Sequence, residues 1–360
     1  MGPALHRLRE QAAPVTAARC GPGPRAPAMP ELVSLDDVRA AARSLTGIAL
    51  RTPLIQFGTA GGGGPRLLLK AESLQPVGSF KIRGAYHAMS TLSGEERARG
   101  VVAHSSGNHA QGVARAARLL GIRATIVMPS DAPPIKRARV EADGAEIVTV
   151  GPASGDREAM AKRLAAERGL VPIPPYDDDR VIAGQGTVGL EIAEDVRDLA
   201  AVLIPIGGGG LASGVAVAVR VLHPNARLVG VESELAADAR ESFRKGRIVR
   251  WQASRTGRTI ADGTRSQAIG RRPFEHLSRL LDDVVTVTEA EIAATVRLIA
   301  EESRLVAEPS GALAPAAARF RSREAALIGL PGTVVAIVSG GNVEGERYRE
   351  LLRSPLPPSE

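Results

Sequence analysis

The chain has 360 residues, of which 44% are hydrophobic, so it is long enough for two domains or one large α/β unit and has the composition of a soluble enzyme. Its formal charge of +7 could suit nucleic acid, but the basic residues are interleaved with acids, and one Trp and three Tyr offer few rings for base stacking. No apolar run approaches the length of a membrane helix. We therefore expect neither a nucleic-acid partner nor a membrane span.

The N-terminal segment, residues 1–30, is rich in Ala, Pro, Gly and Arg, and it has no apolar run long enough for a signal peptide. We predict that it is disordered. Two alternatives stay open: an organellar transit peptide, which is also Arg-rich and poor in acids, or a true start at Met29, just before the helix start at Ser34. Cys20, the only cysteine, lies here, which excludes an intrachain disulfide and a thiolate zinc site and suits a reducing cytoplasm.

Four consecutive glycines, Gly61 to Gly64, stand between Ile55 and the strand-like segment 66–70. No helical pattern follows them, as a phosphate-binding loop would require. We interpret this run as the loop of a hairpin.

Lys81 is the first residue with a candidate chemical role. It stands between a Gly-Ser turn and an apolar-periodic helix, in the stretch Ser79-Phe80-Lys81-Ile82-Arg83-Gly84-Ala85. A lysine held in a dry pocket loses its charge readily and can act as an imine-forming nucleophile or as a base. A lone lysine in the first turn of a helix is more often a surface residue, so the stretch gains weight only from the segments that follow.

Three further segments share one pattern, in which a β-branched or apolar run ends in a small, polar loop. In open α/β sheets, ligands bind beyond the carboxyl ends of the strands, where loop amides and helix N-termini point at anions. We therefore expect these loops and Lys81 to form one pocket. The segments are 101–104 followed by 105–108 and a helix over 109–120, 201–206 followed by 207–211 and a helix over 212–222, and 333–338 followed by 339–342.

Strand and helix patterns alternate after the first of these loops. Strands are expected over 124–128 and 146–150, and helices over 134–142 and 157–168. Farther along, Thr288-Glu289-Ala290-Glu291 predicts the capping box of a long helix.

The glycines at 207 to 210 follow an apolar strand and precede a helix, which favours a phosphate cradle over a flexible loop. Glu232 lies about twenty residues later, where a dinucleotide fold places its ribose-binding acid. A nicotinamide-dependent oxidoreductase is therefore a competing hypothesis. It explains neither the Lys81 stretch nor the loop 105–108.

Taken together, these segments resemble one enzyme family, the serine/threonine dehydratases and serine racemases, which depend on pyridoxal phosphate and have the tryptophan-synthase-β fold type. The similarity runs from about residue 32 to 351, in the family's order and spacing. The matching segments are Pro76-x-Gly78-Ser79-Phe80-Lys81-x-Arg83-Gly84-Ala85, Ser105-Ser106-Gly107-Asn108-His109-Ala110-Gln111-Gly112, Ala183-Gly184-Gln185-Gly186-Thr187, Gly207 to Gly210, and Ser339-Gly340-Gly341-Asn342.

The resemblance implies an α/β fold of two domains, each an open, mostly parallel twisted sheet flanked by helices. The large, cofactor-binding domain would comprise residues 31–100 and 178–352, and a small mobile domain residues 101–177. Residues 1–30 would form the extension and 353–360 a tail. The family also implies a homodimer.

By resemblance, Lys81 would hold pyridoxal phosphate as a Schiff base and then remove the α-proton of the substrate. The phosphate would lie on the glycine loop, the 3′-oxygen would meet Asn108, and Ser339 would contact the pyridine nitrogen. A neutral hydroxyl at that nitrogen would moderate the electron sink and favour elimination over transamination. The implied cofactor-binding residues are Phe80, Lys81, Asn108, Gly207, Gly208, Gly209, Gly210, Leu211 and Ser339.

The resemblance also implies contacts with the substrate. Ser105, Ser106 and the helix start at His109 would receive the substrate carboxylate. Ser106 would further act as the acid or base on the substrate face opposite Lys81, as in serine racemases. Arg157 would help hold the substrate when the small domain closes, and Ser266 would lie near its β-group. Each of these residues alone could equally be a cap or a surface residue.

A divalent-metal site is implied at Glu232, the carbonyl of Ala236, and Asp238, which match the racemase-like branch. Oxygen ligands suit Mg²⁺, with Ca²⁺ or Mn²⁺ as alternatives. On spacing alone, two carboxylates six residues apart would more often be a solvated surface pair.

The expected activity is that of an ammonia-lyase, which converts L-serine or L-threonine through an aminoacrylate to a 2-oxo acid and ammonia. Serine racemase and threo-3-hydroxyaspartate dehydratase are the alternatives, because the choice depends on pocket shape that the sequence leaves open. The expected location is the cytoplasm.

Overall fold

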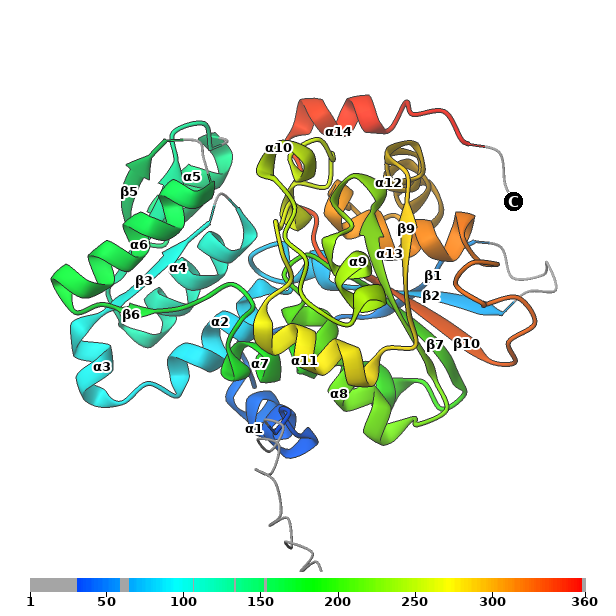
Figure 1. Ribbon diagram of the computed structural model, residues 1–360, viewed down its shortest axis with the longest axis horizontal. Helices are drawn as coiled ribbons and strands as arrows, with labels where there is room; N and C mark the ends of the chain where they lie inside the picture. Colours follow the sequence, from blue (N-terminus) through cyan, green and yellow to red (C-terminus); the bar gives the residue numbers. More distant parts are fainter. Residues whose placement is uncertain (1–30, 59–64, 106, 133, 152–153, 358–360) are drawn as a thin grey trace, which may run out of the picture. The chain divides into compact units, whose positions relative to one another are not determined.

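The computed structural model describes residues 31–58, 65–105, 107–132, 134–151 and 154–357 (Figure 1). Outside the described residues lie the extension 1–30, the glycine run at 61 to 64 and Ser106. The predictions made for these residues are therefore not tested by the structure. The chain divides into Met1–Leu32 and Val33–Glu360, and the architecture below is that of the second unit.

Strands and helices alternate along most of the chain. The strands are β1 (Leu54–Gln56), β2 (Arg66–Ala71), β3 (Val101–His104), β4 (Ala124–Pro129), β5 (Glu146–Val150), β6 (Val171–Pro172), β7 (Leu199–Pro205), β8 (Arg227–Ser233), β9 (Asp283–Val287) and β10 (Thr333–Val338). The α-helices are α1 (Leu35–Ser44), α2 (Lys81–Ser90), α3 (Gly94–Arg99), α4 (Asn108–Leu120), α5 (Pro134–Ala142), α6 (Ser154–Arg168), α7 (Asp179–Asp195), α8 (Gly210–Leu222), α9 (Asp238–Lys245), α10 (Ala253–Thr256), α11 (Arg271–Leu280), α12 (Glu289–Ser303), α13 (Pro309–Phe320) and α14 (Gly345–Leu351). Short 3₁₀ turns are η1 (Glu72–Leu74), η2 (Glu234–Ala236) and η3 (Asp262–Thr264).

The larger sheet has six strands in the order β1-β2-β10-β7-β8-β9, and all neighbours are parallel except β1 and β2. Its inner strands are near-continuous apolar runs: every residue of β10 is buried, as parallel strands covered on both faces require. The antiparallel β1–β2 pair agrees with the expected hairpin. Because β2, β10, β7, β8 and β9 are parallel, their carboxyl ends share one edge of the sheet.

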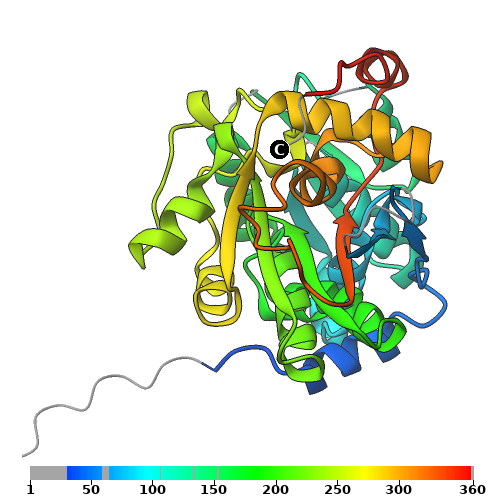
Figure 2. The same cartoon turned by 90° about the vertical axis from the view of Figure 1, so that its right-hand side faces the viewer.

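Helices cover both faces of this sheet (Figure 2). On one face, α12 and α13 contribute Ile292, Ile299 and Leu313 to a core that includes Leu203 of β7. On the other face, α7, α8 and α11 bury a second set of apolar side chains against Val202 and Val335. None of the described helices is long and apolar enough to cross a membrane.

The smaller sheet has four parallel strands in the order β5-β4-β3-β6. All four lie between residues 101 and 172. Helices α2, α4 and α5 cover one face with residues such as Ile82, Val113 and Val140, and α6 covers the other with Leu164. The sequence therefore predicted the α/β class and its parallel sheets correctly.

Helix α2 crosses α7 at a pair of glycines that bring the two backbones close together. An added Cβ at Gly184 would lie 2.6 Å from the Cα of Gly84 and 2.7 Å from the carbonyl oxygen of Arg83, so no larger residue fits there without displacing one helix. The start of α2, and with it Lys81, is thereby fixed against the large sheet.

A buried ion network strengthens the same junction. The Arg83 guanidinium contacts Glu72 at 2.8 Å and Glu191 at 2.6 Å, and the Lys70 amine contacts Glu191 at 2.6 Å. The side chains of Arg83 and Glu72 are 1% and 0% exposed. Burial raises the pKa of Glu72, but the charge and hydrogen bonds of Arg83 outweigh it, so the pKa lies below its ordinary value.

The expected elements agree with those observed to within a few residues. The helix expected over 109–120 begins at Asn108, and the helix expected over 212–222 begins at Gly210. The helix expected from residue 157 begins at Ser154. Thr288 and Glu291 form the predicted capping box of α12.

Candidate active site

Lys81 is the first residue of α2, at the carboxyl edge of the large sheet. Its amine donates a 2.8 Å hydrogen bond to the carbonyl oxygen of Pro175 and lies 5.1 Å from the ring centre of Phe80. The residue is partly exposed, yet the surroundings of the amine are dry enough that burial lowers its pKa from 10.5 to about 8. The amine therefore gives up its proton more readily than a surface lysine does.

The glycine loop follows β7 and opens α8. The backbone N–H groups of residues 207 to 211 donate to no acceptor within the described part of the chain, and they stand at the positive end of a 13-residue helix. Gly209 has φ +94°, which favours glycine. The loop thus offers unpaired donors to an anion, as the sequence predicted for a phosphate cradle.

Tyr176 connects Lys81 with the glycine loop. It directly follows Pro175, whose carbonyl accepts the hydrogen bond of the Lys81 amine. A Cβ added at Gly208 would overlap the Tyr176 ring, and one at Gly210 would lie 3.0 Å from its Cβ. The ring therefore rests directly on the loop. Burial raises the pKa of the Tyr176 hydroxyl to about 12, so it stays protonated near neutral pH.

Ser339 lies at the end of β10, next to the residues that precede Lys81. The backbone N–H of Phe80 donates to the carbonyl of Ser339 at 3.1 Å, and Ser79 forms a β-bridge with Gly340. The Ser339 hydroxyl is buried and donates to the carbonyl of Ser310 at 3.3 Å. These backbone contacts bring the loop 339–342 beside the start of α2 and Lys81.

The start of α4 supplies Asn108 and His109. The Nε2–H of His109 donates to the carbonyl of Ile173 at 2.9 Å, and burial together with the charge of Lys81 lowers the pKa of this imidazole to about 3. His109 is therefore neutral. The hydroxyl of Ser105 accepts a 3.1 Å bond from the N–H of Gly107, which shapes the loop between β3 and α4. Ser106 lies in this loop but outside the described residues.

The two remaining substrate candidates lie in different surroundings. The Ser266 hydroxyl is 3.5 Å from the place a Cβ would take at Gly207, so this residue borders the glycine loop. Arg157 is half-buried on α6. Burial lowers the pKa of its guanidinium, and the charges of Asp131 and Asp156 oppose that shift.

The predicted metal ligands lie at the end of β8, in η2 and at the start of α9. Glu232 accepts bonds from the N–H groups of Ala239 at 3.1 Å and Arg240 at 2.7 Å. Both carboxylate oxygens of Asp238 are buried without a partner in the described chain. Burial raises the pKa of Asp238 to about 7, and burial and the charge of Asp238 raise that of Glu232. Ala236 is buried at the end of η2, between the two acids in sequence. Two buried carboxylates, one with unpaired oxygens, suit a divalent cation.

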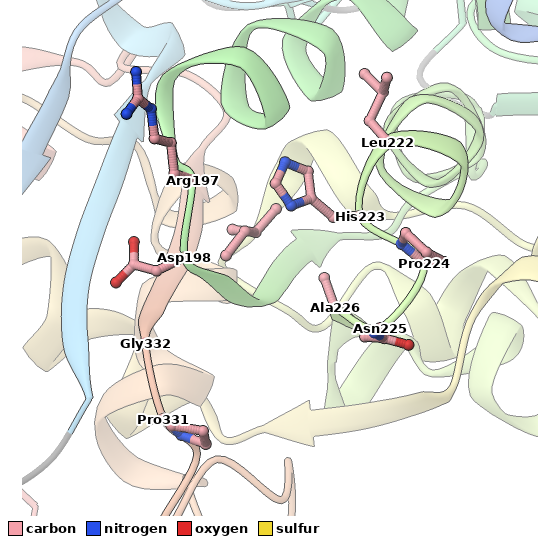
Figure 3. Close-up of a pocket in the computed structure, with 10 residues that line it drawn as sticks. Arg197, Asp198, Leu222, His223, Pro224, Asn225, Ala226, Pro331 and Gly332 are labelled. Carbon is pink, nitrogen blue, oxygen red and sulfur yellow. The ribbon is translucent and has the colours of Figure 1, made fainter.

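A hollow of about 550 Å³ lies at the opposite, amino-terminal edge of the large sheet (Figure 3). Its lining includes Arg197, Asp198, His223 and Pro331, close to the starts of β7, β8 and β10. None of the predicted site residues lines it. Ligand-binding loops of open α/β sheets follow the carboxyl ends of the strands, so we place the site at Lys81 and not in this hollow.

The structure adds site residues that the sequence analysis missed. Glu308, which precedes α13, accepts a 2.5 Å hydrogen bond from Asn108. The Lys136 amine on α5 contacts Asp262 at 2.7 Å, and it would lie 3.3 Å from a Cβ at Gly107. A single acid between the apolar residues 305–307 and the mostly apolar stretch 309–318 was the one available signal for Glu308. Lys136 and Asp262 carry no comparable signal, because ordinary helix and loop residues have the same pattern.

Comparison with known proteins agrees with this geometry. A family model described as pyridoxal-phosphate dependent enzyme matches residues 45–340. The L-threo-3-hydroxyaspartate ammonia-lyase of Saccharomyces cerevisiae is 45% identical over 290 residues, which cover 80% of this chain and 86% of the relative. The serine racemase of Schizosaccharomyces pombe is 40% identical over 324 residues, covering 89% and 98%. The crystal structure of the T.th. threonine deaminase is similar with a TM-score of 0.79 at 44% identity, covering 86% of this chain and 99% of that one.

The match spans both sheets, including all of β10, the lysine at the start of α2 and the glycine loop. It confirms the family and the tryptophan-synthase-β-like fold that the motifs indicated. The chain belongs to the family of pyridoxal-phosphate dependent enzymes.

Proposed function

We propose that the protein is a pyridoxal-phosphate-dependent ammonia-lyase that converts a β-hydroxy amino acid, L-serine or L-threonine, to a 2-oxo acid and ammonia. The observation that carries the proposal is the low-pKa amine of Lys81 beside a loop of unpaired glycine N–H groups, joined by Pro175 and Tyr176. A nicotinamide-dependent oxidoreductase would leave the lysine without a role.

The donor set fits the cofactor. Lys81 would bind its aldehyde carbon, the N–H groups of residues 207 to 211 its phosphate, and Ser339 and Asn108 the pyridine nitrogen and 3′-oxygen. When bound, pyridoxal phosphate supplies an electron sink for the charge left by the departing α-proton. The neutral hydroxyl of Ser339 would keep that sink moderate, which favours elimination.

The proton movements would belong to Lys81. Once its amine is free of the cofactor, it would take the proton from the substrate Cα, and a pKa near neutral pH suits a base that must also release that proton. The β-hydroxyl would leave as water with the proton that the Lys81 ammonium returns. The released aminoacrylate then takes up water, which yields the 2-oxo acid and ammonia. Ser105 and the helix start at His109 would hold the carboxylate of the substrate.

The test is an absorption spectrum of the purified protein, followed by addition of L-serine, L-threonine, D-serine and threo-3-hydroxyaspartate with detection of 2-oxo acid. We expect a visible cofactor band that changes with substrate, and oxo acid from L-serine or L-threonine. A colourless protein that takes up no pyridoxal phosphate would refute the proposal.

A second candidate substrate is L-threo-3-hydroxyaspartate. It is favoured by the 45% identical yeast relative and by the half-buried Arg157, a cation of the kind that receives a second carboxylate. Serine racemase activity is the third candidate, supported by the relative from S. pombe and by a serine at position 106. The same panel separates them: oxo acid mainly from hydroxyaspartate, or D-serine from L-serine with little oxo acid.

We further propose that Glu232, the carbonyl of Ala236, and Asp238 bind Mg²⁺, with Ca²⁺ or Mn²⁺ as alternatives. Millimolar Mg²⁺ should then raise the thermal unfolding midpoint of the wild type, because it binds only the folded chain. Asp238→Asn should abolish that shift. Asp198→Asn, at the opposite edge of the sheet, is the matched control and should retain it. Equal shifts in both variants would contradict the assignment.

Cofactor uptake should depend on pH through Lys81. Since burial lowers the pKa of its amine from 10.5 to about 8, the rate at which cofactor-free protein takes up pyridoxal phosphate should rise with pH and level off above about 8. The unfolded chain keeps this proton up to its ordinary pKa, so the same group adds stability as pH rises between these two values. Stopped-flow absorbance measures the uptake. A rate that rises only near 10.5 would contradict the lowered pKa.

Gly208→Ala should weaken cofactor binding. The added Cβ overlaps the Tyr176 ring, so the ring or the loop must move, and overpacking of this kind costs about 1–3 kcal/mol. The dissociation constant of pyridoxal phosphate should rise roughly tenfold to a hundredfold. Gly94→Ala is the control, since nothing lies within 4 Å of its added Cβ. Similar constants for both variants would show that the loop tolerates the change.

The assembly and setting of the enzyme are also proposals. We propose domains over 31–100 with 178–352 and over 101–177, a homodimer, and a cytoplasmic location. The two separate sheets support two domains, although the apolar core of the smaller sheet also includes Val77, Ile82 and Met89 from the segment assigned to the large domain. Limited proteolysis would test the boundaries, and light scattering the dimer.

A further inference from the structure

The side-chain amide of Asn108 is held from two sides. Its Nδ2 donates to Oε1 of Glu308 at 2.5 Å, and its Oδ1 accepts from Nδ2 of Asn342 at 2.8 Å. Asn342 is itself fixed, because its Nδ2 also donates to the carbonyl of Val77 at 2.8 Å and its Oδ1 accepts from Arg139. The four side chains of Arg139, Asn342, Asn108 and Glu308 form a chain of hydrogen bonds from α5 to the start of α13.

These contacts determine which way the Asn108 amide points. Rotation by 180° would place Oδ1 against the carboxylate of Glu308 and Nδ2 against the Nδ2 of Asn342, which replaces two hydrogen bonds by two repulsive contacts. In the observed orientation, one of the two Nδ2 hydrogens is used by Glu308. The other remains available as a donor.

The side-chain amide of Asn108 lies between helix α4 and the loop 339–342, both of which contact the segment of Lys81. Asn108 opens α4, and a Cβ added at Gly112 of that helix would lie 3.1 Å from the backbone carbon of Lys81. Glu308 contacts the loop 339–342, because its backbone N–H donates to the carbonyl of Gly340 at 3.0 Å. The free Nδ2 hydrogen is therefore placed beside the residues proposed to bind the cofactor.

We propose that Glu308 is a positioning residue, which fixes the Asn108 amide so that its second Nδ2 hydrogen is presented to the 3′-oxygen of pyridoxal phosphate bound at Lys81. The inference rests on the proposed function. Glu308 does not itself touch the cofactor in this assignment; it acts through Asn108. Asn342 is the second hold and secures the acceptor end of the same amide.

The surroundings of Glu308 support this role. Glu308 is 2% exposed, and the ion pair of Lys136 with Asp262 provides the nearby charges. Burial and the charge of Asp262 raise the pKa of Glu308 to about 7, while Lys136 and the bond from Asn108 oppose that shift. Above that pKa the ionised carboxylate can only accept hydrogen bonds, so it admits one orientation of the amide, whereas the protonated carboxyl that prevails at lower pH, or a glutamine, could also donate.

The first test uses the cofactor-free protein. The chain contains three asparagines, Asn108, Asn225 and Asn342, so labelling with ¹⁵N-asparagine gives three side-chain amide signals by NMR. Glu308→Ala and Glu308→Gln should shift the Asn108 signal and speed its hydrogen exchange by about tenfold or more, with Asn225 unchanged. Glu194→Gln is the matched control, because it makes the same change at an exposed acid that pairs with Arg51, and it should leave the Asn108 signal in place. An Asn108 signal unaffected by both Glu308 variants would overturn the hold.

The second test measures the dissociation constant of pyridoxal phosphate. Glu308→Ala and Asn108→Ala should each weaken binding by about tenfold, and the double variant should bind as Asn108→Ala alone does, since Glu308 acts through Asn108. Independent, additive losses would overturn the positioning role. If Glu308→Ala does not fold, Glu308→Gln keeps the side-chain volume and takes its place in the cycle. A wild type that binds no cofactor would refute the proposed function and the contact with the 3′-oxygen, while the NMR result would still decide whether Glu308 holds Asn108.

Discussion

Lys81→Ala is expected to abolish both turnover and covalent retention of the cofactor. The variant loses the Lys81 amine, which donates to the carbonyl of Pro175 and lies beside the Phe80 ring. One residue would supply the covalent anchor and the base for the α-proton, so activity should fall by about 10⁴-fold or more. The purified variant should be colourless, and borohydride reduction should trap no cofactor on the peptide that carries residue 81.

The control is Lys162→Ala, which removes an exposed lysine paired only with Glu158 in the adjoining turn of α6. It should keep the visible band and full activity. A Lys81→Ala protein that retains both colour and oxo acid formation would refute the assignment of Lys81. Loss of activity with retained cofactor would separate the role of the base from that of the anchor, because the glycine loop would then suffice for binding.

Arg83→Met should produce the largest loss of stability among single replacements near the site. The substitution leaves Glu72 buried and, at the same time, removes the guanidinium contacts with both Glu72 and Glu191. Breaking one side of a buried ion network costs about 3–5 kcal/mol, since the remaining charge is poorly solvated. Urea unfolding of the cofactor-free protein measures this loss without a contribution from cofactor binding.

The matched control is Arg51→Met. Arg51 also contacts two acids, Glu194 at 2.9 Å and Asp195 at 2.6 Å, but its side chain is 49% exposed. Such surface pairs contribute about 1 kcal/mol or less. Adding Glu72→Gln to Arg83→Met should recover part of the loss, because the uncompensated charge disappears. Equal losses for Arg83→Met and Arg51→Met would show that burial of the network is not what matters.

The sequence predicted those parts of the site that depend on local pattern. Lys81, the glycine loop and Ser339 each follow a recognisable strand or turn, and parallel strands bring their carboxyl ends to one edge, so the three loops had to meet. The helix starts at Asn108 and Gly210 were placed within two residues, because caps and glycines mark them. The chemical roles of all these residues, and those of Arg157 and Ser266, stay predictions.

The remaining site residues depend on contacts between distant segments, which periodicity does not encode. Glu308 and Asn108 are 200 residues apart in sequence, and Lys136 meets Asp262 across 126. Each looks like an ordinary cap or surface charge in its own segment. The Glu72–Arg83–Glu191 network was missed for the same reason, since an acid and a base alternating with apolar residues usually indicate a solvated helix face.

The position of β10 in the large sheet has a consequence for how the protein is made on the ribosome. β10 is paired on both sides, with β2 and with β7, yet it is synthesised after every other strand of that sheet. Until Thr333–Val338 emerges, β2 and β7 expose unpaired edges, which invite association with other nascent chains. The four strands of the smaller sheet emerge together much earlier and need no later segment to pair. We therefore expect the smaller sheet to form during translation, and the larger one only as synthesis nears its end.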